Sequence, residues 1–204
     1  MTVQTCAHLQ TASSIPAAPT RTEAMQAVRT LIAWAGDDPQ RDGLLDTPKR
    51  VVDAFAEWFS GYHETAADHL QRSFDNPAGY QDMVLVRNMT VVSHCEHHLA
   101  PILGRASIAY RPRERIVGLS KLARVVDMFC RRLQTQETLT AQIGEALESA
   151  LDPAGVAVRI DAVHQCMTTR GVRHPDTRTT TLHFSGVFDE DSRLQERFLR
   201  EVSA

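Results

Sequence analysis

The chain has 204 residues, of which 43% are hydrophobic and 23% are charged, values typical of a single globular domain with a short appendage. Its 22 basic and 25 acidic residues give a formal net charge of −3. That balance excludes a bulk attraction to nucleic acid or anionic lipid, so phosphate binding requires a local basic cluster. No window approaches the roughly 18 consecutive apolar residues of a membrane-spanning helix. We therefore expect neither a nucleic acid nor a membrane as partner.

The four cysteines are too few and too scattered for a disulfide scaffold, which favours a reducing, cytoplasmic setting with free thiols. They are Cys6, Cys95, Cys130 and Cys166. Residues 1–20 contain several Ser and Pro but no Lys, Arg, Asp or Glu, which predicts a flexible polar tail rather than a targeting signal. We expect no role for Cys6 in that tail, or for Cys130 within a helical apolar stripe.

Residues 21–80 predict an N-terminal helical region. Thr20 and Glu23 have the spacing of a capping box, and apolar residues at helical period follow them. Thr47 and Pro48 are typical of the N-cap and first position of a second helix. Two helices are therefore expected before the first strand.

Residues 65–81 show a weak pattern and are expected to be irregular. Residues 81–204 then predict one domain of strands and helices. The first expected elements are strands at 83–92 and 106–110, followed by a helix starting at Ser120 and a helix covering 139–151. Strands at 156–162 and 179–187 and a C-terminal helix around 194–202 complete the chain. Helices followed by strand–strand–helix–helix–strand–strand predict the α+β class.

Two pairs of side chains have the spacing of metal ligands. Cys95 and His98 are three residues apart, so both reach one ion from a tight turn or a helical turn. His164 and Cys166 are two apart, and on a strand they share one face. Thiolate with imidazole is the set that zinc prefers. Cys95, His98 and Cys166 supply three ligands, and His164 is either a fourth ligand or a neighbour of an open, catalytic zinc site.

A basic cluster accompanies the predicted start of a helix. Ser120 lies where free backbone N–H groups attract anions, and Lys121 and Arg124 lie in the same first turn. Cations there are unfavourable for the helix itself, which indicates a compensating anion. Arg170 and Arg50 are further candidates for that anion, and a solvated basic surface is the alternative explanation.

Gln136 and Glu137 are predicted to open the next helix. A carboxylate matches the two adjacent N–H donors on the pairing edge of guanine as a bidentate acceptor. Taken alone, Glu137 is better explained as an acidic residue that favours a helix N-terminus.

Five ordered motifs together resemble the signatures of the GTP cyclohydrolase I family. They are Thr47–Arg50, Cys95–His98, Gly118–Arg124, Gln134–Glu137 and His164–Val172. The resemblance runs from about residue 22 to the C-terminus and leaves only the tail uncovered. No single motif is specific, whereas five in order at compatible spacing are.

The resemblance implies a tunnelling fold, an antiparallel sheet with two helices in ββααββ order, preceded here by N-terminal helices. In this fold, sheets from several subunits join into a barrel, and the family assembles as a homodecamer with active sites at subunit interfaces. The implied reaction converts GTP and water to 7,8-dihydroneopterin triphosphate and formate, the first step of folate or tetrahydrobiopterin synthesis. The implied enzyme is a hydrolase that opens the imidazole ring of guanine.

The resemblance also implies a role for each matched residue. Zn²⁺ is carried over to Cys95, His98 and Cys166, and the acid–base roles to His97 and His164. The implied substrate-binding residues are Ser120, Lys121, Arg124, Gln136, Glu137, Arg170 and Arg50. Glu137, helped by Gln136, corresponds to the guanine contact, and the basic residues with Ser120 correspond to the triphosphate contacts, some of them from a neighbouring subunit.

His94 departs from the family pattern, because that position is usually not basic. It is interpreted as an uninvolved side chain, with a competing ligand or a neighbour that tunes the site as alternatives.

Three other functions compete with this interpretation. A nitrile reductase of related fold needs a cysteine nucleophile and NADPH, and no Gly-x-Gly-x-x-Gly is present. A zinc-dependent base deaminase needs Pro-Cys-x-x-Cys, which is absent, although His94 to Glu96 fits its His-x-Glu half. A zinc-stabilised protein that senses GTP or a pterin without turnover stays open, and the presence of both His97 and His164 argues against it.

Overall fold

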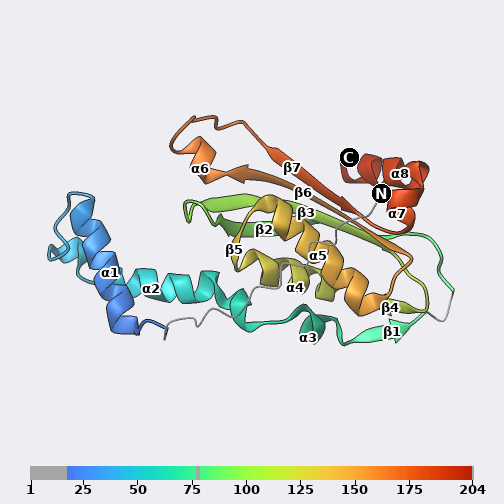
Figure 1. The fold of residues 1–204 in the computed structure, drawn as a ribbon, viewed down its shortest axis with the longest axis horizontal. Helices are drawn as coiled ribbons and strands as arrows, with labels where there is room; N and C mark the ends of the chain where they lie inside the picture. The colour runs from blue at the N-terminus through green and yellow to red at the C-terminus, as the bar shows by residue number, and fades with distance from the viewer. Residues whose placement is uncertain (1–17, 77–78, 204) are drawn as a thin grey trace, which may run out of the picture. The chain divides into compact units, whose positions relative to one another are not determined.

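The computed structural model describes residues 18–76 and 79–203, and Figure 1 shows their helices and strands. These described residues divide into two compact units, one up to Ala56 and one from Glu57 onward. The sequence places its domain boundaries at residues 20 and 80, where the pattern changes, and these boundaries stay a prediction. Residues 1–17 of the predicted tail, Cys6 included, lie outside the described residues.

The first unit contains helix α1 (Arg21–Trp34), a 3₁₀ turn η1 (Asp42–Leu44) and most of helix α2 (Thr47–Trp58). The predicted capping box is present, because Thr20 Oγ1 accepts from the Glu23 N–H and the Glu23 carboxylate accepts from the Thr20 N–H at 2.7 Å. Both expected helices are therefore found.

The second unit opens with short elements. The first is η2 (Ser60–His63). Two more, α3 (Ala66–Leu70) and β1 (Ser73–Asp75), lie in the stretch 65–81 that the sequence predicts to be irregular. Thr65 caps α3 by accepting from the Asp68 N–H, and β1 pairs with β4 (Arg115–Val117), about 40 residues further on. A pairing over that distance leaves no periodicity in either segment, so the prediction was wrong here.

Five strands form the main sheet of this unit, in the spatial order β5–β2–β3–β6–β7. Their bounds are β2 (Val84–Cys95), β3 (Pro101–Arg111), β5 (Leu133–Gln134), β6 (Gly155–His164) and β7 (Thr179–Phe184). Neighbours are antiparallel except β2 and β5, which run parallel. Alternate residues of each strand therefore face opposite sides of the sheet.

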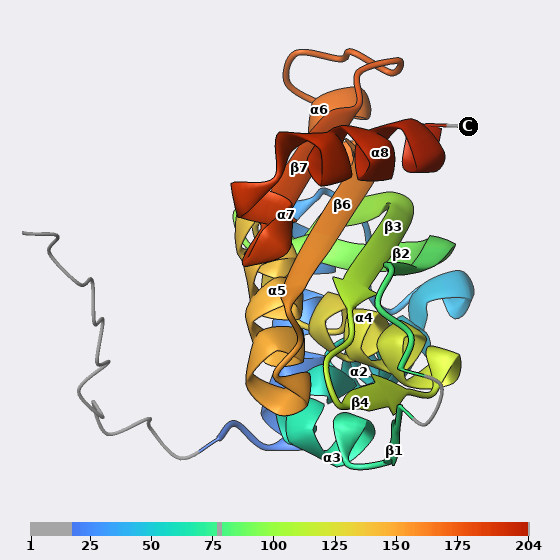
Figure 2. The same ribbon diagram turned by 90° about the vertical axis from the view of Figure 1, so that its right-hand side faces the viewer.

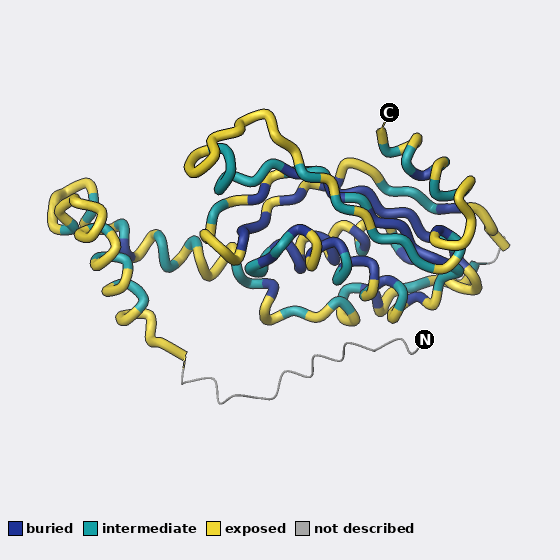
Figure 3. Tube along the Cα trace, turned by 45° about the horizontal axis from the view of Figure 1, so that its top comes forward, coloured by how far each residue is buried: buried dark blue, intermediate teal, exposed yellow. Residues whose placement is uncertain are grey.

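Helices cover both faces of the sheet, as Figures 1 and 2 show. One face carries α4 (Leu119–Cys130) and α5 (Gln136–Leu151), which enclose the larger apolar core, with Ile108, Val158 and Ile160 among its sheet residues. On the other face lie α7 (Val187–Glu190) and α8 (Ser192–Ser203), over a smaller core. Figure 3 shows the buried residues following the strands and the two long helices.

The order β2–β3–α4–α5–β6–β7 after N-terminal helices confirms the predicted α+β class and the ββααββ arrangement of the tunnelling fold. Within residues 18–76 and 79–203, no helix combines the length and the apolar character needed to span a bilayer.

Candidate metal centre and active site

Cys95 and His98 lie where β2 ends in a tight turn. The Leu99 N–H donates to Cys95 O at 2.9 Å, and the Cys95 N–H donates to Ala100 O at 2.8 Å. Leu99 has a φ of 54°, which closes the turn. Cys95 Sγ lies 3.9 Å from His98 Nδ1, so the predicted pair does face one point.

Cys166 joins this pair from a different element. The sequence predicts that His164 and Cys166 share a strand face, and this is wrong, because β6 ends at His164 and Cys166 lies in the short helix α6 (Gln165–Thr168). Cys166 therefore does not continue the side-chain alternation of β6. The donor atoms of Cys95, His98 and Cys166 all lie within 4.8 Å of one another.

These three side chains fit a zinc ion. A tetrahedral site with Zn–S of about 2.3 Å and Zn–N of about 2.0 Å has ligand–ligand edges of about 3.5–3.8 Å, close to the observed Cys95–His98 separation. Burial is the main cause of the raised pKa of Cys166, and the adjacent Cys95 thiol raises it further. Two thiolates this close need a neighbouring cation, which is what a divalent metal supplies.

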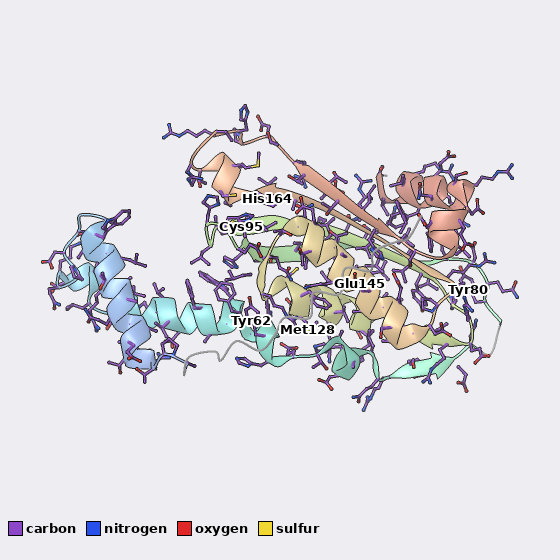
Figure 4. The ribbon with its side chains drawn as sticks, viewed as in Figure 1. Tyr62, Tyr80, Cys95, Met128, Glu145 and His164 are labelled. Atoms are coloured by element: carbon purple, nitrogen blue, oxygen red, sulfur yellow. The ribbon has the colours of Figure 1, made fainter. Side chains whose placement is uncertain are left out.

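His164 lies beside the metal-ligand group without belonging to it (Figure 4). Its Nε2 is 2.8 Å from Gln136 Oε1, in the first turn of α5. Burial lowers the pKa of His164, and the carboxylate of Glu137 opposes that shift. A neutral imidazole is therefore held next to the candidate metal centre. The Gln136 contact was missed from the sequence, because 28 residues separate the two positions and no spacing rule links them.

Two exposed side chains border the same end of the sheet. The His97 ring centroid lies 6.3 Å from that of His98. The His97 side chain is exposed to solvent, with an exposed fraction of 68%. Arg170 Nη1 lies 3.2 Å from His98 Nε2. The structure thus brings six predicted site residues to one end of the sheet: Cys95, His97, His98, His164, Cys166 and Arg170. Gln136 and Glu137 reach that end from α5.

His94 is buried and points away from the metal-ligand group. Its ring packs on Trp58 and Phe59, with centroid separations of 4.8 and 5.3 Å. Its Nδ1 has no hydrogen-bond partner among the described residues, and burial lowers its pKa. His94 is not among the three grouped ligands.

Ser120 and Lys121 lie in the first turn of α4, at the other end of the sheet. His164 pairs with Ile102 on β3, whereas Tyr110 of β3 accepts a hydrogen bond through its Oη from the Val117 N–H, just before α4. Tyr110 is eight positions along the strand from Ile102, a distance of about 27 Å. A single chain therefore does not bring the first turn of α4 to the candidate metal centre.

Arg124 shares that first part of α4 with Ser120 and Lys121. Arg50 belongs to the first compact unit, where it is exposed and forms an ion pair with Asp46 at 3.3 Å. For Arg50, the predicted phosphate contact stays a prediction.

Fold and site together define a class of protein: an α+β chain with a Cys–His–Cys group at the end of its sheet, beside the half-buried His164. The chain belongs to the GTP cyclohydrolase I family, whose model matches residues 24–203. It is therefore an enzyme of that family, a hydrolase.

The relatives cover nearly the whole chain. The GTP cyclohydrolase 1 of Maricaulis maris (strain MCS10) is 58% identical over 189 residues, covering 93% of this chain and 92% of that protein. That of Hyphomonas neptunium (strain ATCC 15444) is 59% identical over 181 residues, covering 89% and 88%. The solved apo structure of archaeosine synthase QueF-Like aligns over 52% of this chain and 94% of its own, with 18% identity and a TM-score of 0.44. A similarity of that size does not discriminate among functions.

Proposed function

We propose that this chain converts GTP and water to 7,8-dihydroneopterin triphosphate and formate in the cytoplasm, as the first step of folate or tetrahydrobiopterin synthesis, with Zn²⁺ held by Cys95, His98 and Cys166. The observation that carries the proposal is the meeting of these three donors beside His164 in a chain of this family. Zinc bound there with one open position would supply a Lewis acid and activate water at neutral pH.

His164 and His97 are the proposed acid–base residues. Burial lowers the pKa of His164, so its ring is neutral at pH 7 and can accept a proton and then return it to a nitrogen of the purine imidazole ring. His97 is exposed and is adjacent in sequence to the proposed ligand His98, so solvent and small molecules can reach its ring.

Glu137 is the proposed guanine contact. It lies in the first turn of α5, close enough to His164 to affect its pKa, so a base held by Glu137 has its imidazole ring next to the acid–base group. The carboxylate accepts from the N1–H and the amino group of guanine, a pair of donors that adenine does not present.

The triphosphate contacts are proposed to come from two copies of the chain. Arg170 is already beside His98, whereas Lys121 and Arg124 lie in α4, whose start is near Tyr110 at the opposite end of β3. A neighbouring subunit that apposes its α4 to this end of the sheet would supply the missing cations. The proposed assembly is therefore a homo-oligomer, a decamer by resemblance, with the active site shared across an interface. Ser120 and Arg50 complete the proposed phosphate contacts.

The test is to add GTP to the zinc-loaded protein and to measure formate and a pterin product together. Equal amounts of both products are expected, and formate should not appear after Cys166→Ala. Cys130→Ala is the matched control, because Cys130 is buried inside α4 and should leave zinc binding and turnover intact. Tight GTP binding by the wild-type protein without formate would instead establish a non-catalytic binding protein.

A further inference from the structure

The side-chain amide of Gln136 is buried in the interior, with only 1% of the residue exposed. Its Nε2 lies 3.0 Å from Ile160 O, 2.9 Å from Thr179 O and 3.1 Å from Thr181 Oγ1. Its Oε1 lies 2.8 Å from His164 Nε2. Both ends of the amide are therefore engaged by protein groups.

The chemistry of these neighbours fixes which way the amide faces. Ile160 O and Thr179 O are backbone carbonyls, which only accept, so the group opposite them must be the donating NH₂. The amide oxygen then faces His164 and only accepts. His164 Nε2 must consequently carry a proton, and in the neutral ring Nδ1 is the bare nitrogen.

Two threonines hold the amide in this orientation. Thr140 Oγ1 donates to Gln136 O at 2.7 Å, and it lies 2.6 Å from Thr181 Oγ1. Because the Thr140 hydrogen is used on the carbonyl, Thr181 donates to Thr140 and keeps a lone pair for the Gln136 NH₂. The two hydrogens of the Gln136 NH₂ thus face three acceptors, and a rotated amide would turn its oxygen toward the carbonyl oxygens of Ile160 and Thr179.

We propose that Gln136 is a positioning residue that holds His164 in the tautomer protonated at Nε2 and leaves Nδ1 to exchange the proton with substrate. The proposal rests on the acid–base role of His164 proposed above. It assigns the Gln136 side chain to His164 and leaves recognition of guanine to Glu137. Gln136 is not a catalytic residue, because both the NH₂ and the oxygen of its amide already bind protein groups.

The first test needs no variant. Solid-state NMR of ¹⁵N-histidine-labelled, zinc-loaded protein, at a pH well above the usual histidine pKa of about 6.5, distinguishes protonated from bare ring nitrogens. The His164 signals are those that vanish in His164→Gln. A protonated Nε2 with a bare Nδ1 is expected. A protonated Nδ1 with a bare Nε2, or a metal-bound Nδ1, would overturn the proposal.

The second test compares two buried glutamines. Gln136→Met removes the acceptor for His164, so its tautomers should mix and kcat should fall about 10- to 100-fold with little change in KM, a loss typical of a supporting hydrogen bond at an active site. Gln134→Met is the control, because Gln134 is equally buried but donates to Phe129 O and to Gln142 Oε1. It should leave the His164 tautomer unchanged.

The outcomes separate this proposal from the proposed reaction. A large rise in KM for GTP in Gln136→Met, with the His164 signals unchanged, would show a direct guanine contact and refute the positioning role. If wild-type protein forms no formate yet has the expected tautomer, the reaction fails and the geometric assignment stands. The wild-type spectrum decides the tautomer even where Gln136→Met does not fold.

Discussion

Cys95 and Cys166 differ from Cys130 in their surroundings, although all three are free thiols. Burial inside α4 raises the pKa of Cys130 to about 12, so it stays protonated and unreactive at neutral pH. Cys166 is partly exposed and faces both Cys95 and the imidazole of His98. A cysteine with an imidazole and a second sulfur as neighbours is a candidate metal ligand, whereas a cysteine surrounded by apolar groups acts as a small apolar side chain.

Glu137→Ala is predicted to raise the KM for GTP by at least about tenfold and to weaken the preference for GTP over ATP. The reason is that the variant loses the carboxylate that accepts from the two N–H donors of guanine. Steady-state kinetics with both nucleotides measures this. Glu145→Ala is the matched control, since Glu145 is exposed on the same helix, and should change neither value. Unchanged base preference in Glu137→Ala would remove this residue from the guanine site.

Among the elements, α5 is placed by its packing on β6 and β7 as well as by its own sequence. Thr135 caps its N-terminus by accepting from the Thr138 N–H at 3.1 Å. Gly144 lets it approach β7, because a Cβ there would lie 2.2 Å from His183 Cδ2. His183 Nε2 lies 2.7 Å from Glu148 Oε1, and this hydrogen bond keeps the ring from moving aside. The close approach also places Gln136 against Thr179 and Thr181.

Gly144→Ala is therefore predicted to destabilise the fold by about 1–3 kcal/mol, the usual cost of overpacking. Urea unfolding followed by circular dichroism measures the change. The double variant Gly144→Ala/His183→Ala removes the obstructing ring and should be less destabilised than the sum of the two single variants. Strict additivity of the two effects would contradict this account of the helix–strand contact.

The long elements and the grouping of Cys95, His98 and Cys166 could be predicted from the sequence, and the short elements could not. Apolar periodicity identifies α4, α5 and β6, because each buries a regular stripe. It misses β1, which pairs with the distant strand β4, and it places Cys166 on a strand that has already ended. The contact between Gln136 and His164 depends on how α5 lies against β6, which is a property of packing rather than of spacing.

For the whole molecule, the main consequence of the fold is that the proposed site is divided. The candidate metal centre and the first turn of α4 lie at opposite ends of β3. The sheet also leaves β7 as an edge strand, which is open to pairing with another copy. Assembly is thus proposed to complete the active site.

Complementation between inactive variants tests this division. A Lys121→Ala/Arg124→Ala chain lacks the basic half, and a His164→Ala chain lacks the acid–base half. Co-expressed in equal amounts, they should regain about a quarter of wild-type activity per site, since random mixing leaves that share of interfaces intact. Mixtures as inactive as the separate variants would show that each chain uses its own α4.

The central claim is that Cys95, His98 and Cys166 hold one metal ion and leave a coordination position open. X-ray absorption spectroscopy of the zinc-loaded protein tests it most directly. Two sulfur ligands at about 2.3 Å, one imidazole nitrogen at about 2.0 Å and one exchangeable oxygen are expected. A fourth ligand from a protein side chain, or fewer than two sulfurs, would contradict it.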